Sequence, residues 1–184
     1  LYRMEKPLLC AEILVVDDNT VNRELLTGIL RNAGHSVRTA CDGTTGLTAA
    51  RREHPEIILL DVNMPEMDGF TTCGHLKADR ELRDIPVLFI SASQQTFDKV
   101  RAFQVGGIDY ITKPVHHEEV LARIQAHLEL RRQRREIQQL HDQEKAYFEW
   151  LGEQQRQMLR VASHDLRSPL QVVGLSAELL KERM

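Results

Sequence analysis

Short apolar runs alternate with helical patterns from residue 12 to residue 128, and this alternation constrains the fold more than any other feature. The pattern predicts strands joined by amphipathic helices into a parallel sheet. The first, third and fourth runs are almost entirely Val, Ile, Leu and Phe, as strands buried on both faces require. We therefore expect an α/β fold, a doubly wound five-stranded parallel sheet followed by a long coiled-coil helix. The expected strands are 13–16, 36–40, 57–60, 87–90 and 109–111, and the expected helices lie near 21–32, 44–53, 71–78, 96–104 and from 118 onward.

Length and composition narrow the classes of protein that fit. The 184 residues have room for one domain with a core and an extension, and the net charge of -3 indicates no nucleic-acid partner. Cys10, Cys41 and Cys73 show no metal-binding spacing, so we expect free thiols in a reducing compartment. No run approaches the roughly 20 apolar residues of a membrane span. We expect a cytoplasmic piece of a longer protein, with no membrane segment of its own.

Beyond about residue 128 the sequence is rich in Gln, Glu and Arg and has neither Gly nor Pro until Gly152. Apolar residues recur there at spacings of three and four, which predicts a coiled-coil seam and a homodimer through this helix. Glu144 and Gln154 interrupt the seam, and its phase shifts after residue 161. The alternative is a single surface helix that packs back on the first domain. The seam consists of Ile137, Leu140, Tyr147, Leu151, Met158 and Val161.

Polar side chains follow four of the predicted strands. Asp17 and Asp18 come after the first strand, Asp61 after the third, Ser91 after the fourth and Lys113 after the fifth. The carboxyl ends of parallel strands meet at one edge of a sheet, so these groups should converge there. Carboxylates that converge repel one another unless a cation lies among them, and oxygen ligands suit Mg²⁺. The alternative, in which each Asp caps the next helix, explains a single Asp better than the whole set.

The strings "ILVVDDN", "IILLDVNMPEMDG", "VLFISAS" and "DYITKP" resemble the response-regulator receiver domain over about residues 11 to 128. The resemblance implies a flavodoxin-like fold and a phosphoryl group carried on Asp61. It implies a histidine kinase or a phosphotransfer protein as the phosphoryl donor. It also implies Mg²⁺ held by Asp17, Asp18, Asp61 and the backbone carbonyl of Asn63.

The same resemblance implies roles for the ends of the fourth and fifth strands. Ser91 and Lys113 are expected to contact the phosphoryl oxygens, and the bond before Pro114 is expected to be cis. Tyr110 is expected to turn inward when Ser91 is drawn toward the phosphate. From the residues alone, Tyr110 is better described as an ordinary half-buried edge aromatic.

A second motif, "SHDLRSPLQ", begins at Ser163. His164 precedes an acid that can orient its ring, and Pro169 removes one helical hydrogen bond and bends the helix. The string resembles the H-box of histidine kinases, which implies that His164 is phosphorylated and that Asp165 acts as its base. No ATP-binding motif follows it, so we expect this chain to lack the catalytic domain and to be unable to phosphorylate itself with ATP.

These observations predict a receiver domain at 11–128, a coiled-coil signalling helix at 129–160 and the first helix of a histidine kinase dimerisation and phosphotransfer domain at 161–184. The favoured hypothesis is a two-component phosphorelay protein in which the receiver regulates a histidine kinase. One alternative is a non-catalytic docking and dimerisation module, against which the complete acidic pocket argues. The other is a response regulator with a separate output domain, although no helix-turn-helix pattern follows.

Overall fold

The computed structural model describes residues 10–92 and 96–181, with side chains at 10–92 and 100–161. The chain divides into two units, Leu1–Arg132 and Gln133–Met184. No described helix is long and apolar enough to cross a membrane.

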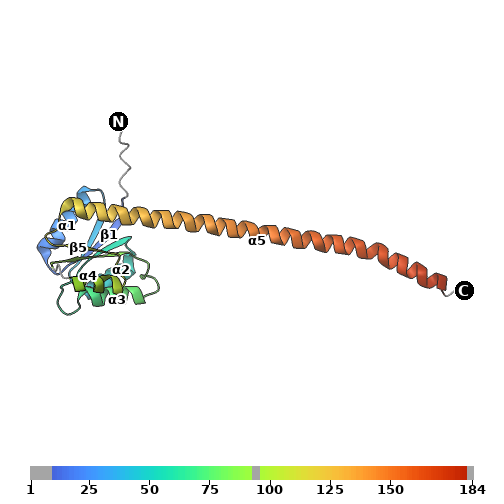
Figure 1. Cartoon of the computed structure of the whole chain (residues 1–184), viewed down its shortest axis with the longest axis horizontal. Coiled ribbons are helices and arrows are strands. Elements are labelled where there is room, and N and C mark those ends of the chain that lie inside the picture. The colour runs from blue at the N-terminus through green and yellow to red at the C-terminus, as the bar shows by residue number, and fades with distance from the viewer. Residues whose placement is uncertain (1–9, 93–95, 182–184) are drawn as a thin grey trace, which may run out of the picture. The chain divides into compact units, whose positions relative to one another are not determined.

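The elements of Figure 1 are β1 (Glu12–Val16), α1 (Thr20–Asn32), β2 (Ser36–Ala40), α2 (Gly43–Glu53), β3 (Ile57–Asp61), α3 (Gly69–Ala78), β4 (Val87–Ser91), α4 (Thr96–Gln104), β5 (Asp109–Thr112) and α5 (His117–Lys181).

The first unit contains a five-stranded parallel sheet in the order β2-β1-β3-β4-β5. This arrangement confirms the predicted fold class. The order of the strands reverses between β1 and β3, and open sheets of this kind bind ligands at the carboxyl ends of the strands beside such a reversal. The fold therefore directs attention to the residues that end β1 and β3.

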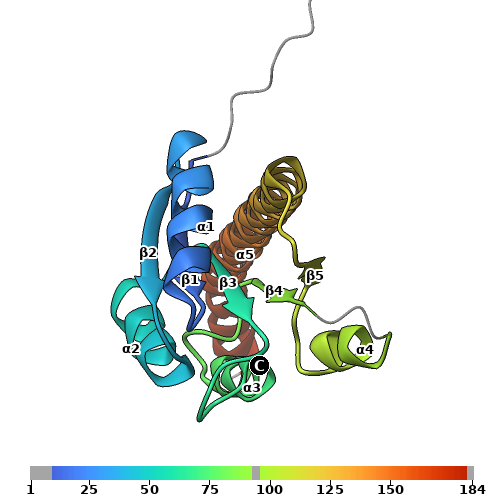
Figure 2. The ribbon, with the colours of Figure 1, turned by 90° about the vertical axis from the view of Figure 1, so that its left-hand side faces the viewer.

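Helices cover both faces of the sheet, and each face has its own apolar core. Helix α1 lies on one side of the sheet, and α2, α3 and α4 lie on the other (Figure 2). The first turns of α5 share the core of α1 through Val120, Ile124 and Leu128. Fully burying each such side chain contributes about 1.5–3 kcal/mol.

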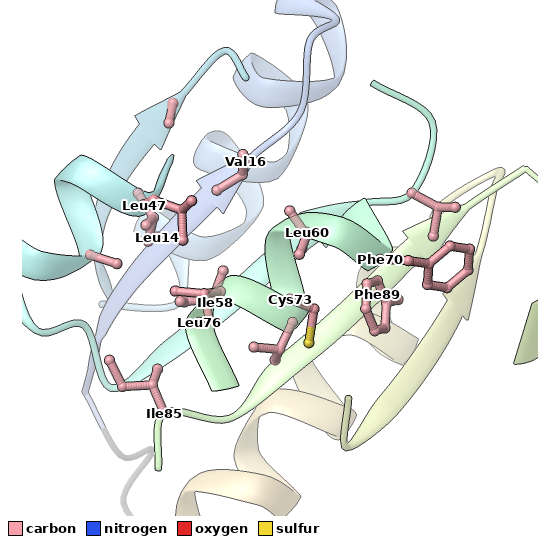
Figure 3. Close-up of a cluster of buried hydrophobic side chains, with 14 of the residues drawn as sticks. Leu14, Val16, Leu47, Ile58, Leu60, Phe70, Cys73, Leu76, Ile85 and Phe89 are labelled. Carbon is pink, nitrogen blue, oxygen red and sulfur yellow. The ribbon is translucent and has the colours of Figure 1, made fainter. Parts of the chain in front are cut away.

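The core under α2, α3 and α4 is shown in Figure 3. Phe70 of α3 and Phe89 of β4 meet with ring centroids 5.3 Å apart, beside the buried Cys73. Burial raises the pKa of the Cys73 thiol to about 11, so at neutral pH the group is an inert packing residue. The three cysteines are free, as expected from their spacing.

Helix α5 continues from the first unit into the second. Its backbone stays helical through Pro169 to Lys181. In the second unit the described apolar side chains are exposed, among them Ile137, Leu151 and Met158. The long helix predicted from the polar composition is therefore present.

Candidate functional site

The structure brings the three predicted carboxylates together. Asp17 follows β1 and Asp61 is the last residue of β3, and one oxygen from each of Asp17, Asp18 and Asp61 lies within 4.8 Å of the others. Asp17 and Asp61 are only 1% and 4% exposed, whereas Asp18 is exposed. Solvent can therefore reach this cluster from the Asp18 side.

None of the three carboxylates caps a helix. The N-terminus of α1 is capped by Asn19, and that of α3 is capped by Asp68. Asp17 instead accepts hydrogen bonds from the backbone N–H of Asn19 at 2.8 Å and from the side chain of Asn22. The simpler explanation of these acids as capping residues is wrong, because other side chains satisfy the helix ends.

Lys113 connects two of the carboxylates. Its Nζ donates to Asp17 Oδ2 and to Asp61 Oδ1, both at 3.0 Å. The Lys113–Pro114 bond is cis, as the family resemblance implied. Burial lowers the pKa of Lys113, but the hydrogen bonds to Asp17 and Asp61 outweigh it and leave this pKa above its ordinary value. Lys113 is therefore a fixed cation at the edge of the cluster.

Lys113 alone does not neutralise the cluster. Burial raises the pKa of Asp61, and the negative charges of Asp17 and Asp18 also raise it. The hydrogen bond and the charge of Lys113 lower this pKa, but by less, so it lies above its ordinary value. Burial and the neighbouring carboxylates thus make the charged form of Asp61 less favourable here than in water, and a further cation would offset this. Three carboxylates with an exposed side are a donor set that fits Mg²⁺, which prefers oxygen ligands and keeps bound water.

Ser91 and Tyr110 occupy neighbouring strands. Ser91 is the last residue of β4 and is buried, and its carbonyl accepts from the backbone N–H of Lys113 at 2.7 Å. Tyr110 lies opposite Phe89 in the sheet, on the edge strand β5, and is 6% exposed. It is therefore an edge aromatic, as described from the residues alone, but it is buried and not half-buried. The core under α3 and α4 extends to β5 and covers this ring. The predicted movement of Tyr110 stays a prediction.

Asn63 lies beyond β3 and is exposed. It lines a pocket of about 440 Å³ together with Asp18, Asp68 and Arg101. The local sequence did not indicate Arg101 or Asp68, because they come from α4 and from the start of α3 and meet only in the folded chain. The side chains of His164 and Asp165 lie outside the described residues, so their predicted roles remain predictions.

A charged network joins β5 to the start of α5. Asp109 accepts from Arg123 at 2.7 Å and lies 3.0 Å from a ring nitrogen of His127, and Arg123 also pairs with Glu119. Burial raises the pKa of Asp109, but the bonds from His127, the Tyr110 backbone and Arg123 hold it below its ordinary value. This network connects α5 to the strand that precedes Lys113.

Comparisons with known proteins agree with this geometry. The family model described as "Response regulator receiver domain" matches residues 13–125. RpaA of Synechocystis, a DNA-binding dual master transcriptional regulator, is 42% identical over 114 residues, which are 62% of this chain and 47% of RpaA. The chain thus matches about half the length of that relative.

Two solved structures are also similar. Chemotaxis protein CheY4 of Vibrio cholerae has a TM-score of 0.62 and 30% identity, over 64% of this chain and 98% of CheY4. The receiver domain of sensor histidine kinase PA1611 from Pseudomonas aeruginosa has a TM-score of 0.57 and 30% identity, over 62% of this chain and 97% of that domain. A magnesium ion is coordinated in the active-site cleft of the PA1611 domain.

Proposed function

Because this chain belongs to the response regulator receiver domain family, whose members accept a phosphoryl group on Asp in two-component signalling, we propose that Asp61 is the acceptor here. The observation that carries the proposal is Lys113, which bonds Asp61 and Asp17 at equal distances inside a cluster of three acids. Asp61 is buried and the neighbouring Asp18 is exposed, so we infer that a donor approaches Asp61 from the Asp18 side. A histidine kinase or a phosphotransfer protein is the proposed donor.

Each residue of the site has a task in phosphoryl transfer. A carboxylate oxygen of Asp61 attacks the phosphorus of the donor's phosphohistidine and forms the new O–P bond, while the P–N bond breaks and its electron pair stays on the histidine ring nitrogen. Lys113 and the Ser91 hydroxyl hold two of the phosphoryl oxygens. Mg²⁺ bound by Asp17, Asp18, Asp61 and the Asn63 carbonyl would supply the positive charge that offsets the phosphoryl oxygens. Tyr110 then turns inward as Ser91 is drawn toward the phosphate, which transmits the event to the face formed by α4 and β5.

We expect the chain to gain one phosphoryl group when it is incubated with acetyl phosphate and Mg²⁺. Removing the metal with a chelator should abolish the adduct, because Lys113 alone does not neutralise three carboxylates and an incoming phosphate. The intact mass of the chain measures the adduct directly. An adduct of equal yield with and without metal would contradict the proposed site.

We further propose that the receiver regulates a histidine kinase whose phosphorylated residue is His164. The proposed segments are a receiver at 11–128, a signalling helix at 129–160 and the first helix of a dimerisation and phosphotransfer domain at 161–184. The "SHDLRSPLQ" string and the similarity to the receiver domain of a sensor histidine kinase support this assignment. The proposed location is the cytoplasm, with no nucleic-acid partner. The similarity to RpaA, a DNA-binding transcriptional regulator, favours the alternative, in which this chain is part of a response regulator with a separate output domain.

A parallel dimer through α5 is the proposed link between the two sites. Six side chains of the predicted seam are between 41% and 74% exposed, so the helix offers them to a second copy. Within the first unit, the Asp109 network ties the start of this helix to β5. A shift of β5 on phosphorylation would therefore reach the seam.

Coupling can be tested in a protein that joins this chain to an ATP-binding kinase domain. Asp61→Asn should change the rate of His164 phosphorylation, and Leu151→Glu should remove that effect and weaken dimerisation by more than about tenfold. Leu159→Glu is the matched control, because Leu159 is also exposed, at 68% against 41% for Leu151, but lies off the seam. Radiolabelling and sedimentation equilibrium give the two readouts. An unchanged rate in Asp61→Asn would remove the receiver from kinase regulation and favour a separate output.

A further inference from the structure

The loop between β1 and α1 carries two carboxylates of the acidic cluster, Asp17 and Asp18, and its backbone carbonyls need hydrogen-bond donors. In a continuous helix, the N–H groups of the two residues four positions later would donate to these carbonyls. Those groups belong to Val21 and Asn22, and both donate instead to the side chain of Asn19, at 2.9 and 3.3 Å. The cap of α1 therefore leaves the carbonyls of Asp17 and Asp18 to another donor.

Arg23 supplies that donor. Its Nη1 donates to the carbonyl of Asp17 at 2.6 Å and to that of Asp18 at 2.9 Å, so one nitrogen bridges two consecutive carbonyls. Its Nη2 donates to Thr20 Oγ1 at 2.9 Å, which anchors the guanidinium to the first residue of α1. A guanidinium holds several acceptors in one fixed, planar geometry. The loop is thus fastened to α1 at both of the residues that carry the carboxylates.

The carboxylate of Asp17 is held from the same turn of the helix. Asn22 Nδ2 donates to its two oxygens at 3.3 and 3.2 Å, while Arg23 holds the carbonyl of the same residue. Two consecutive residues of α1 therefore fix both the backbone and the side chain of Asp17. For the exposed Asp18, the bond from Arg23 fixes the backbone from which its carboxylate reaches the cluster.

We propose that Arg23 is a positioning residue of the metal site, which holds the loop so that the carboxylates of Asp17 and Asp18 lie together with that of Asp61. The inference rests on the proposed function, in which this cluster binds Mg²⁺. Groups that orient the ligands of a metal, without touching it, commonly contribute about 10–100-fold to metal affinity. Arg23 acts in this way through the backbone of the loop.

The charge of Arg23, taken alone, would have the opposite effect. A guanidinium bonded to the residues that carry two of the carboxylates repels an incoming divalent cation. If Arg23 acted only through its charge, its removal would therefore raise the affinity for Mg²⁺. Positioning predicts a lower affinity, because the loop loses the bonds that hold both carboxylates in place. The sign of the change separates the two roles.

The test measures Mg²⁺ binding by isothermal titration calorimetry, with no phosphoryl donor present, for the wild-type chain, Arg23→Met, Arg23→Gln and Arg31→Met. We expect Arg23→Met to weaken Mg²⁺ binding about tenfold. Arg23→Gln also removes the charge but keeps a donor, so it should weaken binding by less.

Arg31→Met is the matched control. Arg31 belongs to the same helix and lines the same groove of about 700 Å³ as Arg23, but its guanidinium donates to the carbonyl of Val37 at 3.2 Å and not to the loop. The variant removes the same charge from α1 and should leave the affinity for Mg²⁺ unchanged or slightly higher.

Urea unfolding with and without Mg²⁺ gives a second readout. A ligand that binds only the folded chain stabilises it by mass action, so a tenfold weaker affinity lowers the stabilisation at saturating Mg²⁺ by about 1.4 kcal/mol. The free energy of unfolding without Mg²⁺ reports any general loss of stability separately. If Arg23→Met does not fold, the sign of the change in Arg23→Gln decides the question.

Unchanged or tighter Mg²⁺ binding in the Arg23 variants would overturn the proposal. An equal loss of affinity in Arg31→Met would also overturn it, because that variant leaves the loop contacts intact. If the wild-type chain itself bound no Mg²⁺, the metal site of the proposed function would be refuted, and this inference with it.

Discussion

Asp61→Asn is expected to remove the Mg²⁺-dependent phosphoryl adduct completely while the fold is retained. The amide is nearly the same size as the carboxylate but is a poor nucleophile and a poorer metal ligand. Burial raises the pKa of Asp61, which means that its charge disfavours the folded state when no metal is bound. Lys113 keeps Asp17 as a partner in the variant. The free energy of unfolding without Mg²⁺ should therefore be equal to or about 1 kcal/mol above that of the wild-type chain.

Asp84→Asn is the matched control for this variant. It removes the same charge from an exposed position outside the cluster and should leave the adduct and the stability unchanged. Intact mass and urea unfolding give the two readouts. An adduct on Asp61→Asn of the same yield as on the wild-type chain would show that another group is the acceptor.

Gly69→Ala should cause the largest loss of stability among single methyl additions close to the site. Gly69 opens α3, and a Cβ there would lie 2.2 Å from the carbonyl oxygen of Asp61 and 2.9 Å from the Cα of Val62. These are backbone atoms, so the end of β3 or the start of α3 must move. Overpacking of this kind costs about 1–3 kcal/mol, and here the movement also displaces the carboxylate of Asp61, the proposed acceptor.

Gly74→Ala in the same helix provides the control, since a Cβ there meets nothing within 4 Å. It should stabilise the chain by about 0.5–1 kcal/mol, because alanine favours helix more than glycine does. Urea unfolding of both variants, together with the rate of labelling by acetyl phosphate, checks this contrast. Equal stability of the two alanine variants would mean that α3 does not approach β3 as closely as described.

The sheet could be predicted from the sequence because its strands are buried on both faces and read as continuous apolar runs. The ends of the strands were predicted less well. Strands β3 and β4 extend one residue further than expected, because Asp61 pairs with Ile90 and Ser91 pairs with Thr112 in the ladder. A polar side chain at the end of an apolar run gives no sign of this pairing in the sequence. The proposed acceptor, Asp61, therefore belongs to strand β3 and not to the loop after it.

The convergence of the acids also followed from the sequence, because parallel strands place their carboxyl ends together. The contacts of Lys113 with two particular oxygens did not follow, since they depend on the path of the chain after β5. The capping roles of Asn19 and Asp68 were missed because an Asp at the end of the strand is an equally good candidate in the sequence. Arg101 carried no local signal, because its partners Phe70 and Asp68 belong to another helix.

The central claim is that Asp61 itself carries the phosphoryl group, and locating the modified residue tests it most directly. The chain labelled with acetyl phosphate and Mg²⁺ can be reduced with borohydride, which converts a phosphorylated aspartate to homoserine, and then digested for tandem mass spectrometry. We predict homoserine at position 61 and at no other position. Homoserine at Asp17 or Asp18, or a peptide around Asp61 that remains unmodified in a labelled chain, would contradict the assignment of the site.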